Sequence, residues 1–266
     1  IMPSLVGSEM CIRDRAGCFM VKRPIHRLGG PVPVPEMDEL AEESIITLFN
    51  NDQTVVRLLA SPFDLGDLAY GHVICEGRGT VNSVTVHGHD VNIKGSVRVR
   101  PTEDLLTASC GACTTGDVAI PSGTVVNTVR LDANLDEMLD LMRSNQPWFE
   151  ATGGMHAAAI FSESGELLLV REDIGRHNAF DKVVGASLRN EVSPKIIVLS
   201  SRIGWELVAK AVRVGIEIIV AAGSISSAAE NLSRASGITL IGFAASKRPS
   251  VIGNLSRIID KPSSNP

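Results

Sequence analysis

The feature that most constrains the fold is a regular alternation of strand-like and helix-like segments in the C-terminal half of the chain. Short apolar runs that suit buried strands are separated by longer runs with the periodicity of amphipathic helices. The expected strands cover residues 157–161, 167–171, 195–200, 217–222 and 238–243, and the expected helices cover residues 177–188, 204–214 and 226–235. Helices that connect successive strands of one sheet make part of that sheet parallel. The sequence therefore predicts an α/β (α+β) fold with a mixed sheet and crossover helices.

The N-terminal half is expected to form a smaller, β-rich subdomain. A hairpin is predicted from strands at residues 43–48 and 54–60, joined by turn-forming residues at 50–53. Further along the chain we expect a helix at 65–75, antiparallel strands at 81–86, 90–93 and 96–100, and an amphipathic helix at 135–144. Cys75 lies on the apolar helix, which predicts a buried core thiol.

The two ends of the chain are expected to lie outside this core. Residues 1–15 resemble translated sequencing-adapter sequence, which gives Cys11 no expected role and makes Met20 the expected start. Prolines at positions 24, 31, 33 and 35 predict an extended arm, on the surface or across a partner subunit. The polar tail is expected to be loosely ordered. The predicted organisation is a non-native extension (1–19), the N-terminal subdomain (20–134), the α/β domain (135–245) and the tail (246–266).

Composition narrows the class of protein. With 266 residues, of which 44% are hydrophobic, the chain can bury a substantial core. A net charge of -5 argues against nucleic acid as a partner, and we find no apolar run of membrane-spanning length and no secretory signal. A cytoplasmic location is therefore expected. In a reducing compartment, five cysteines that include a Cys-x-x-Cys pair indicate catalysis or metal binding more than a disulfide framework.

Cys110 and Cys113 form that pair, in a segment rich in glycine and poor in core-building side chains. Metal ligation, disulfide exchange and sulfur carriage are all open to two thiols at this spacing. Gly111, Gly116 and Gly123 permit backbone conformations that other residues resist, which predicts a loop. The pair is therefore expected on a reactive loop whose chemistry the spacing alone does not decide.

The densest polar stretch, residues 172–182, lies where a predicted strand passes into a predicted helix. His177 and Asp181 are four residues apart, so a His–carboxylate hydrogen bond is geometrically available, and Arg176 stands at the positive entrance of the helix. Ser200, Arg202 and Ser224 follow other strands. Ligands bind beyond the carboxyl ends of such strands, so these residues predict an anion site, although helix caps and solvated ion pairs use the same residue types.

His156 stands alone in a run of small residues, which is typical of a close packing site. The alternative is a zinc site with Cys110 and Cys113, as in nucleobase deaminases. This alternative fits poorly, because Ala158 occupies the position of the required glutamate and the cysteines precede the histidine. No metal site is therefore expected.

Together these segments resemble the formate dehydrogenase accessory sulfurtransferases, the FdhD family. The resemblance runs from about residue 25 to 243 and rests on residues 110–113, 152–159, 172–182, 200–210 and 237–243. It implies a cytidine-deaminase-like fold and a homodimer. It also implies that a cysteine persulfide, received from a cysteine desulfurase, passes sulfur to the molybdenum cofactor, bis-molybdopterin guanine dinucleotide, before that cofactor enters formate dehydrogenase or a related molybdenum or tungsten oxidoreductase.

The resemblance also assigns roles to residues. It makes Cys110 the persulfide carrier and Cys113 its assistant. The cofactor, or GDP as a mimic of its guanine nucleotide, is expected to contact Arg176, His177, Ser200, Arg202, Ser224, Phe243, Ala244, Ala245, Ser246, Lys247 and Arg248. The chain departs from the family pattern at Thr114, at Ser201 and after Phe243. The expected function is sulfur transfer, with a non-catalytic cofactor-binding chaperone and a zinc-dependent deaminase as alternatives.

Overall fold

The structure is a computed structural model that describes residues 20–99, 105–106, 121 and 123–259. The predicted extension at residues 1–19 and both members of the Cys-x-x-Cys pair lie outside the described residues. None of the described helices is long and apolar enough to cross a membrane.

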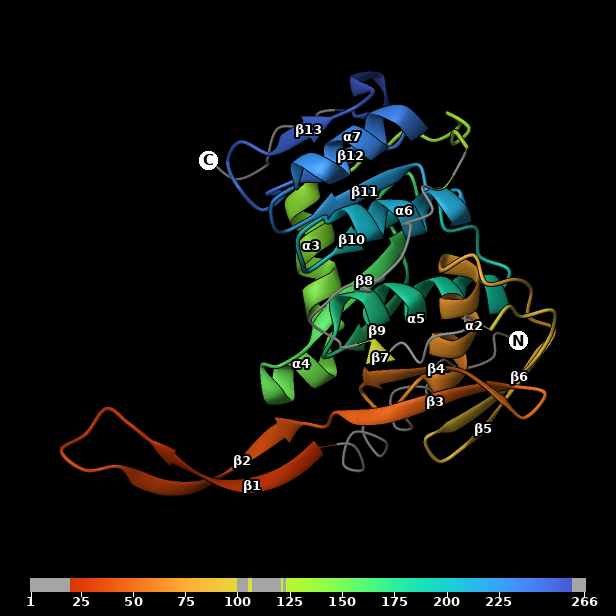
Figure 1. Cartoon of the computed structure of the whole chain (residues 1–266). Helices are drawn as coiled ribbons and strands as arrows, with labels where there is room; N and C mark the ends of the chain where they lie inside the picture. Colours follow the sequence, from red (N-terminus) through yellow and green to blue (C-terminus); the bar gives the residue numbers. More distant parts are fainter. Residues whose placement is uncertain (1–19, 100–104, 107–120, 122, 260–266) are drawn as a thin grey trace, which may run out of the picture.

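The larger sheet has six strands in the order β13-β12-β11-β10-β8-β9 (Figure 1). Its strands are β8 (His156–Phe161), β9 (Leu167–Asp173), β10 (Ile196–Leu199), β11 (Ile218–Ala221), β12 (Thr239–Gly242) and β13 (Ser250–Ile252). Strands β10, β11 and β12 are parallel, and the other neighbouring pairs are antiparallel. The parallel part follows from the crossover helices, as predicted.

Those helices are α5 (Arg176–Arg189), α6 (Trp205–Val214) and α7 (Ser227–Ser236). Their apolar side chains pack on one face of the sheet, where they form one core cluster with alternate strand residues. On the opposite face, α3 (Leu135–Ser144) contributes Met138, Leu139 and Met142 to a second cluster. The predicted α+β class, a mixed sheet with crossover helices beside a smaller β-rich part, is confirmed.

The smaller sheet has the order β5-β6-β3-β4-β7. It contains β3 (Ser44–Asn50), β4 (Gln53–Ala60), β5 (Ser83–His87), β6 (Asp90–Lys94) and β7 (Leu105–Leu106), with α2 (Leu65–Cys75) packed on it. The predicted strand at 96–100 is wrong for residues 96–99, which make only an isolated bridge from Val97 to Gly79. The backbones cross too closely for a ladder there, since a Cβ on Gly79 would lie 1.8 Å from the carbonyl oxygen of Ser96.

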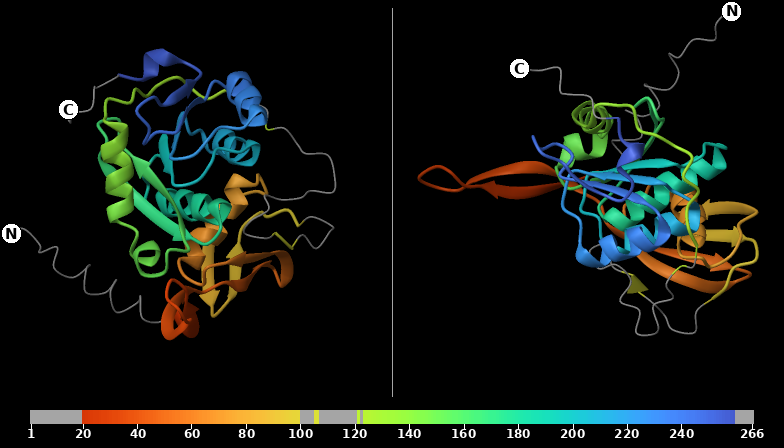
Figure 2. Two further views of the ribbon diagram at one scale, coloured as in Figure 1. Left: turned by 90° about the vertical axis from the view of Figure 1, so that its left-hand side faces the viewer. Right: turned by 90° about the horizontal axis from the view of Figure 1, so that it is seen from above.

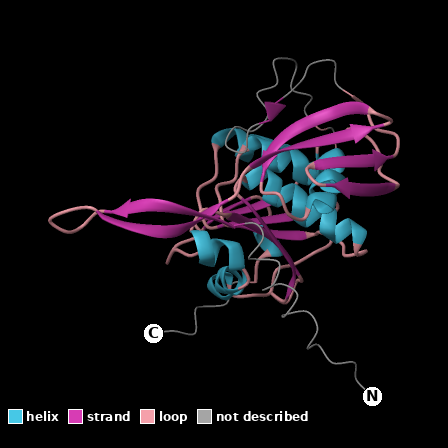
Figure 3. Cartoon of the chain, turned by 90° about the horizontal axis from the view of Figure 1, so that it is seen from below, coloured by secondary structure: helices cyan, strands magenta, loops and turns pink. Residues whose placement is uncertain are grey.

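Helices α2 and α5 lie between the two sheets and touch through their backbones (Figure 3). A Cβ on Gly71 would lie 1.8 Å from the carbonyl oxygen of Asp181, and one on Gly185 would lie 1.9 Å from that of Asp67. Only glycine allows this approach at both positions. The two sheets are therefore joined by a helix pair whose backbones touch at these two points.

The predicted arm is a two-stranded antiparallel ribbon of β1 (Met20–Arg27) and β2 (Val34–Ala41), which projects from the rest of the chain (Figures 1 and 2). Arg27 forms salt bridges with Glu36 and Asp38 on the opposite strand. Pro24 and Pro35 are tolerated because among the described residues β1 and β2 pair only with each other.

Two expectations about the C-terminal half need correction. A short helix, α4 (Pro147–Thr152), precedes β8 and was not predicted. The tail is not loosely ordered over residues 250–258, because β13 pairs with β12 and a 3-10 turn (Leu255–Arg257) follows it. Arg257 anchors this segment: its guanidinium is buried, donates to the carbonyl oxygens of Glu217 and Gly237, and lies 3.4 Å from the Glu217 carboxylate.

Candidate functional site

The polar residues that follow the strands of the larger sheet lie together at the carboxyl ends of its parallel strands, here called the strand edge. Strand β9 ends at Asp173, which pairs with His156 at the start of the antiparallel β8. The ends of the three parallel strands are linked by hydrogen bonds from Ala222 N to Leu199 O (3.0 Å) and from Phe243 N to Gly223 O (2.9 Å). The structure therefore brings to this edge the segments that hold nearly all predicted cofactor-binding residues: Arg176, His177, Ser200, Arg202, Ser224 and 243–248.

The start of α5 lies at this edge. Arg176 is its first residue, its first turn has no acidic residue, and its N-cap residue, Gly175, has no side chain that could cap it, although the Asp173 carboxylate accepts from the Gly175 N–H (2.8 Å). The N–H groups of a first turn lack intrahelical partners and carry the positive end of the helix dipole. Helices α6 and α7 also begin at this edge, but Glu206 lies in the first turn of α6 and the hydroxyl of Ser226 caps α7.

Ser200 and His156 lie side by side at the edge. The Ser200 hydroxyl accepts a hydrogen bond from Ala157 N (2.9 Å) and lies 3.3 Å from Nδ1 of His156. Burial, and then the charge of Arg176, lower the pKa of His156 below its usual value, so its imidazole is neutral at pH 7. Among the described residues, no group of three or more histidine, cysteine or acidic side chains is arranged to hold a metal ion.

The segment after β12 is a tight turn. Phe243 has a left-handed backbone (φ 51°), an uncommon conformation for a residue other than glycine, and its ring is 48% exposed. Ala244 is buried and its N–H donates to Ala221 O, so neither its side chain nor its N–H faces the edge. By contrast, Ala245, Ser246, Lys247, Arg248 and, across the edge, Arg202 are exposed.

His177 is buried beneath this edge, and the hydrogen bond to Asp181 that its spacing makes available is not formed. Instead, both carboxylate oxygens of Asp181 accept hydrogen bonds from Nζ of Lys210 (2.7 Å each), and one of them lies 3.1 Å from Nδ1 of His72. Within the described residues neither ring nitrogen of His177 has a hydrogen-bond partner. Burial, with the charges of Lys210 and Arg176 added, lowers the pKa of His177 to about 3. A neutral imidazole cannot supply positive charge to a phosphate.

The Asp181–Lys210 pair belongs to a buried cluster where α2, α5 and α6 meet. Glu76 lies 2.9 Å from Nζ of Lys210, and Cys75 is fully buried nearby. Burial and the charge of Asp181 raise the pKa of the Cys75 thiol well above its usual value, so it is a core thiol, as predicted, and no nucleophile. The thiols expected to carry sulfur, Cys110 and Cys113, are outside the described residues.

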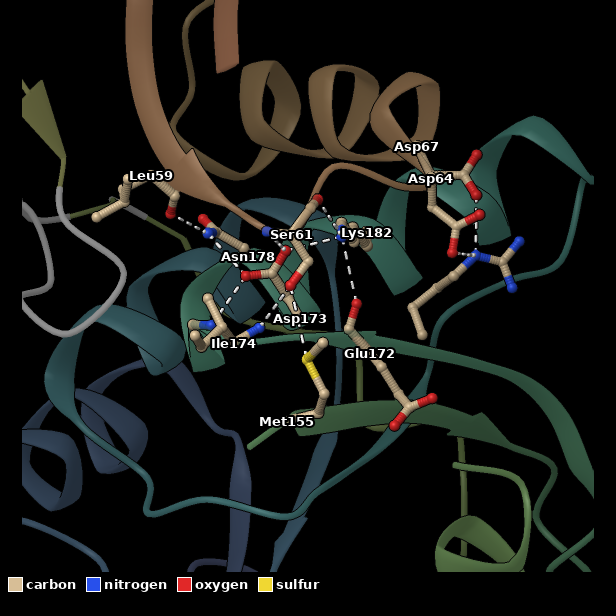
Figure 4. A network of polar contacts seen from close by, with 12 residues as sticks. Leu59, Ser61, Asp64, Asp67, Met155, Glu172, Asp173, Ile174, Asn178 and Lys182 are labelled. Carbon is tan, nitrogen blue, oxygen red and sulfur yellow. Dashed lines mark hydrogen bonds and ion pairs between the residues drawn. The ribbon is translucent and has the colours of Figure 1, made fainter. Parts of the chain in front are cut away.

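A second buried network surrounds Asp173 and joins the two sheets (Figure 4). The Asp173 carboxylate is fully buried, pairs with Nζ of Lys182 (2.7 Å), and accepts from Ser61 N (3.1 Å) and Gly175 N (2.8 Å). Nδ2 of Asn178 donates both to Asp173 (3.0 Å) and to Leu59 O (2.9 Å). No individual role was predicted for these residues, although all of them except Leu59 and Ser61 lie in the dense polar stretch 172–182.

Glu172 faces away from this network and binds the start of α4. Its two carboxylate oxygens accept from Phe149 N (2.8 Å) and Trp148 N (3.1 Å). Burial raises the pKa of Glu172 to about 7, and the two N–H groups oppose that shift. Its side chain therefore changes charge near neutral pH.

Comparisons with known proteins agree with this fold. The model of the FdhD/NarQ family matches residues 41–259. A sulfur carrier protein FdhD from Nocardia farcinica is 32% identical over 270 residues, covering 91% of this chain and 96% of that protein. A protein of the same name from Sulfurisphaera tokodaii is 30% identical, covering 91% and 100%.

A crystal structure described as that of a formate dehydrogenase accessory protein from Desulfotalea psychrophila shares the fold. Its TM-score is 0.77 with 20% identity, and the match covers 91% of this chain and 100% of that one. The sequence relatives and the family model extend over both sheets and over the strand edge described above. The chain belongs to the FdhD/NarQ family.

Proposed function

We propose that this protein is a sulfur carrier that takes persulfide sulfur from a cysteine desulfurase. The sulfur passes to bis-molybdopterin guanine dinucleotide, which serves formate dehydrogenase or a related molybdenum or tungsten oxidoreductase. The observation that carries the proposal is the similarity, over 91% of the chain, to proteins named sulfur carrier protein FdhD. Free reactive thiols persist in reducing compartments, which supports a cytoplasmic location.

The proposed chemistry uses both thiols of the Cys-x-x-Cys pair. In loading, the Cys110 thiolate attacks the outer sulfur of the desulfurase persulfide; an S–S bond forms on Cys110 and the desulfurase cysteine leaves as a thiolate. In delivery, the Cys113 thiolate attacks the inner sulfur of the Cys110 persulfide, which forms a disulfide and releases hydrosulfide to the cofactor. The two cysteines supply the two electrons, and a cellular dithiol reduces the disulfide afterwards.

The strand edge is the proposed site for the cofactor. Arg176, at the positive end of the α5 dipole, suits one phosphate, and the exposed Arg202, Lys247 and Arg248 suit others. The exposed ring of Phe243 suits stacking on the guanine base. The neutral His177 offers one donor and one acceptor, which suits a heterocycle edge better than a phosphate. GDP is the simplest probe of this site, and the proposed carrier is a homodimer.

The test is mass spectrometry of the protein after incubation with a cysteine desulfurase and L-cysteine. We expect a mass increase of one sulfur atom on the peptide that holds Cys110 and Cys113, and none after Cys110→Ala/Cys113→Ala. Cys75→Ala is the matched control, since its buried thiol should not change loading. If the wild-type protein shows no mass increase after this incubation, the proposal is refuted.

The same cysteine variants separate sulfur transfer from a cofactor-binding chaperone. The chaperone is favoured by the strand edge, whose described residues would bind phosphates without any thiol. A chaperone predicts that Cys110→Ala and Cys113→Ala still activate formate dehydrogenase in a strain that lacks its own accessory protein. A sulfur carrier predicts that activation is lost while GDP still binds.

A further inference from the structure

Two strands from different sheets end against the start of α5. Strand β9 belongs to the larger sheet and leads into the edge with Arg176. Strand β4 belongs to the smaller sheet and runs parallel to β7, with Arg57 opposite Leu105 and Leu58 opposite Leu106. Strand β7 is the last described element before the segment that holds the thiol pair. The end of β4, which pairs with β7, therefore lies beside the proposed cofactor site.

No backbone ladder connects the two sheets in the described residues, and beyond the backbone contact of α2 with α5, side chains fix the end of β4 against the start of α5. Asn178 links the two strands through its side-chain Nδ2, which donates one hydrogen bond to Leu59 O in β4 and another to the carboxylate of Asp173 in β9. Ser61, just after β4, adds a second link, because its hydroxyl accepts from Ile174 N (3.1 Å). Figure 4 shows these side chains converging between the end of β4 and the start of α5.

The acceptors of this junction are themselves held in place. Asp173 and Lys182 are fully buried and paired at 2.7 Å, and Lys182 also donates to Ser61 O (3.2 Å). The ammonium group of Lys182 lies 4.1 Å from the centre of the Phe63 ring. A buried pair with its remaining bonds satisfied is rigid, because any displacement leaves a charge uncompensated. Asn178 thus connects β4 to a fixed point at the strand edge.

We infer that Asn178, supported by Ser61, is a positioning residue for sulfur delivery: it holds β4, and with it β7, in register with the strand edge that would receive the cofactor. This inference rests on the proposed function. Loading needs only the thiols and the desulfurase, whereas delivery needs the thiols and the cofactor site in one fixed relation. Asn178 itself touches neither sulfur nor cofactor.

The experiment compares Asn178→Ala with Asn190→Ala in the full-length chain. Asn190 is a matched control, because it follows the other end of α5 and its Nδ2 also donates to a backbone carbonyl, that of Ala186. Three quantities are measured: sulfur loading by mass spectrometry, GDP affinity by calorimetry, and formate dehydrogenase activity restored in a strain without its own accessory protein.

For Asn178→Ala we expect loading and GDP affinity close to wild type and a loss of restored activity of about 10- to 100-fold, as small misplacements of reacting groups cause. Asn190→Ala should match wild type in all three. If Asn178→Ala does not fold, Ser61→Ala is the milder variant, which removes only a hydroxyl and should lower delivery but not loading.

Equal restored activity in wild type, Asn178→Ala and Ser61→Ala would overturn the inference while the sulfur-carrier proposal stands. Loading that falls in parallel with activity would also overturn it, because the side chain would then serve the fold alone. A wild-type chain that accepts no sulfur would refute the proposed function and this inference together.

Discussion

Replacing Lys210 with methionine should test how the buried cluster stabilises the fold. Nζ of Lys210 lies 2.7 Å from both oxygens of Asp181 and 2.9 Å from Oε1 of Glu76. Burial opposes the charge on Lys210, yet the two carboxylates raise its pKa above the usual value. Lys210→Met would remove the cation that pairs with the Asp181 carboxylate, whose side chain is only 1% exposed.

The expected cost follows from what the variant leaves behind. Removing one member of a buried ion pair costs about 3–5 kcal/mol, a large share of the roughly 5–15 kcal/mol that keeps a typical domain folded. Methionine has a volume close to that of lysine, so little of the cost should come from a cavity. We therefore expect Lys210→Met to lower the free energy of unfolding by about 3 kcal/mol or more at pH 7.5.

Urea-induced equilibrium unfolding measures this quantity. The matched control is Arg234→Met, which breaks the exposed Arg234–Glu230 pair within one helix (3.0 Å) and should cost about 0.5 kcal/mol or less. Asp181→Asn should cost much less in the Lys210→Met background than in wild type, since it then removes an unpaired charge. A cost below about 1 kcal/mol for Lys210→Met, or additive costs in the double variant, would refute the reasoning.

Three further outcomes test other parts of the structure. Gly71→Ala should give little folded protein, since its Cβ would lie 1.8 Å from the carbonyl oxygen of Asp181. The control on the same helix is Gly66→Ala, where the nearest atom is 3.1 Å away on a flexible arginine, and it should keep the wild-type melting temperature. A wild-type melting temperature for Gly71→Ala would count against the contact between the two helix backbones. In the folded protein the pKa of His177 is about 3, so between pH 6.5 and pH 3 a proton binds to this imidazole only in the unfolded chain, and the free energy of unfolding falls as the pH falls. His177→Gln should therefore remove about 2 kcal/mol of the stability that the wild type loses between pH 7.5 and pH 5, measured by urea unfolding at both pH values. If the variant loses as much stability as the wild type, the prediction is contradicted. Glu172 has a folded pKa near 7 against an ordinary 4.5, so its contribution to stability falls as pH rises between those values. Relative to wild type, Glu172→Gln should gain roughly 2.5 kcal/mol of stability between pH 5 and pH 8, and a difference independent of pH would rule this out.

The amino-acid sequence by itself determined the order and type of most elements. The predicted helix at 135–144 coincides with α3, and every strand and crossover helix of the larger sheet except the unpredicted β13 lies within a residue or two of its predicted bounds. These predictions succeed because hydrophobic periodicity is a local property that a buried face imposes on each element. The strand edge followed from the same information, since parallel strands place their carboxyl ends together.

Only the tertiary structure decided which side chains are partners. The four-residue spacing of His177 and Asp181 allowed a local hydrogen bond, but Asp181 binds Lys210 and His72, which come from α6 and α2. The burial of Arg257 in an expected loose tail and the bond from Asn178 to β4 were equally hidden. A buried polar group takes the partner that the packing of distant elements brings to it, and no local pattern records that packing.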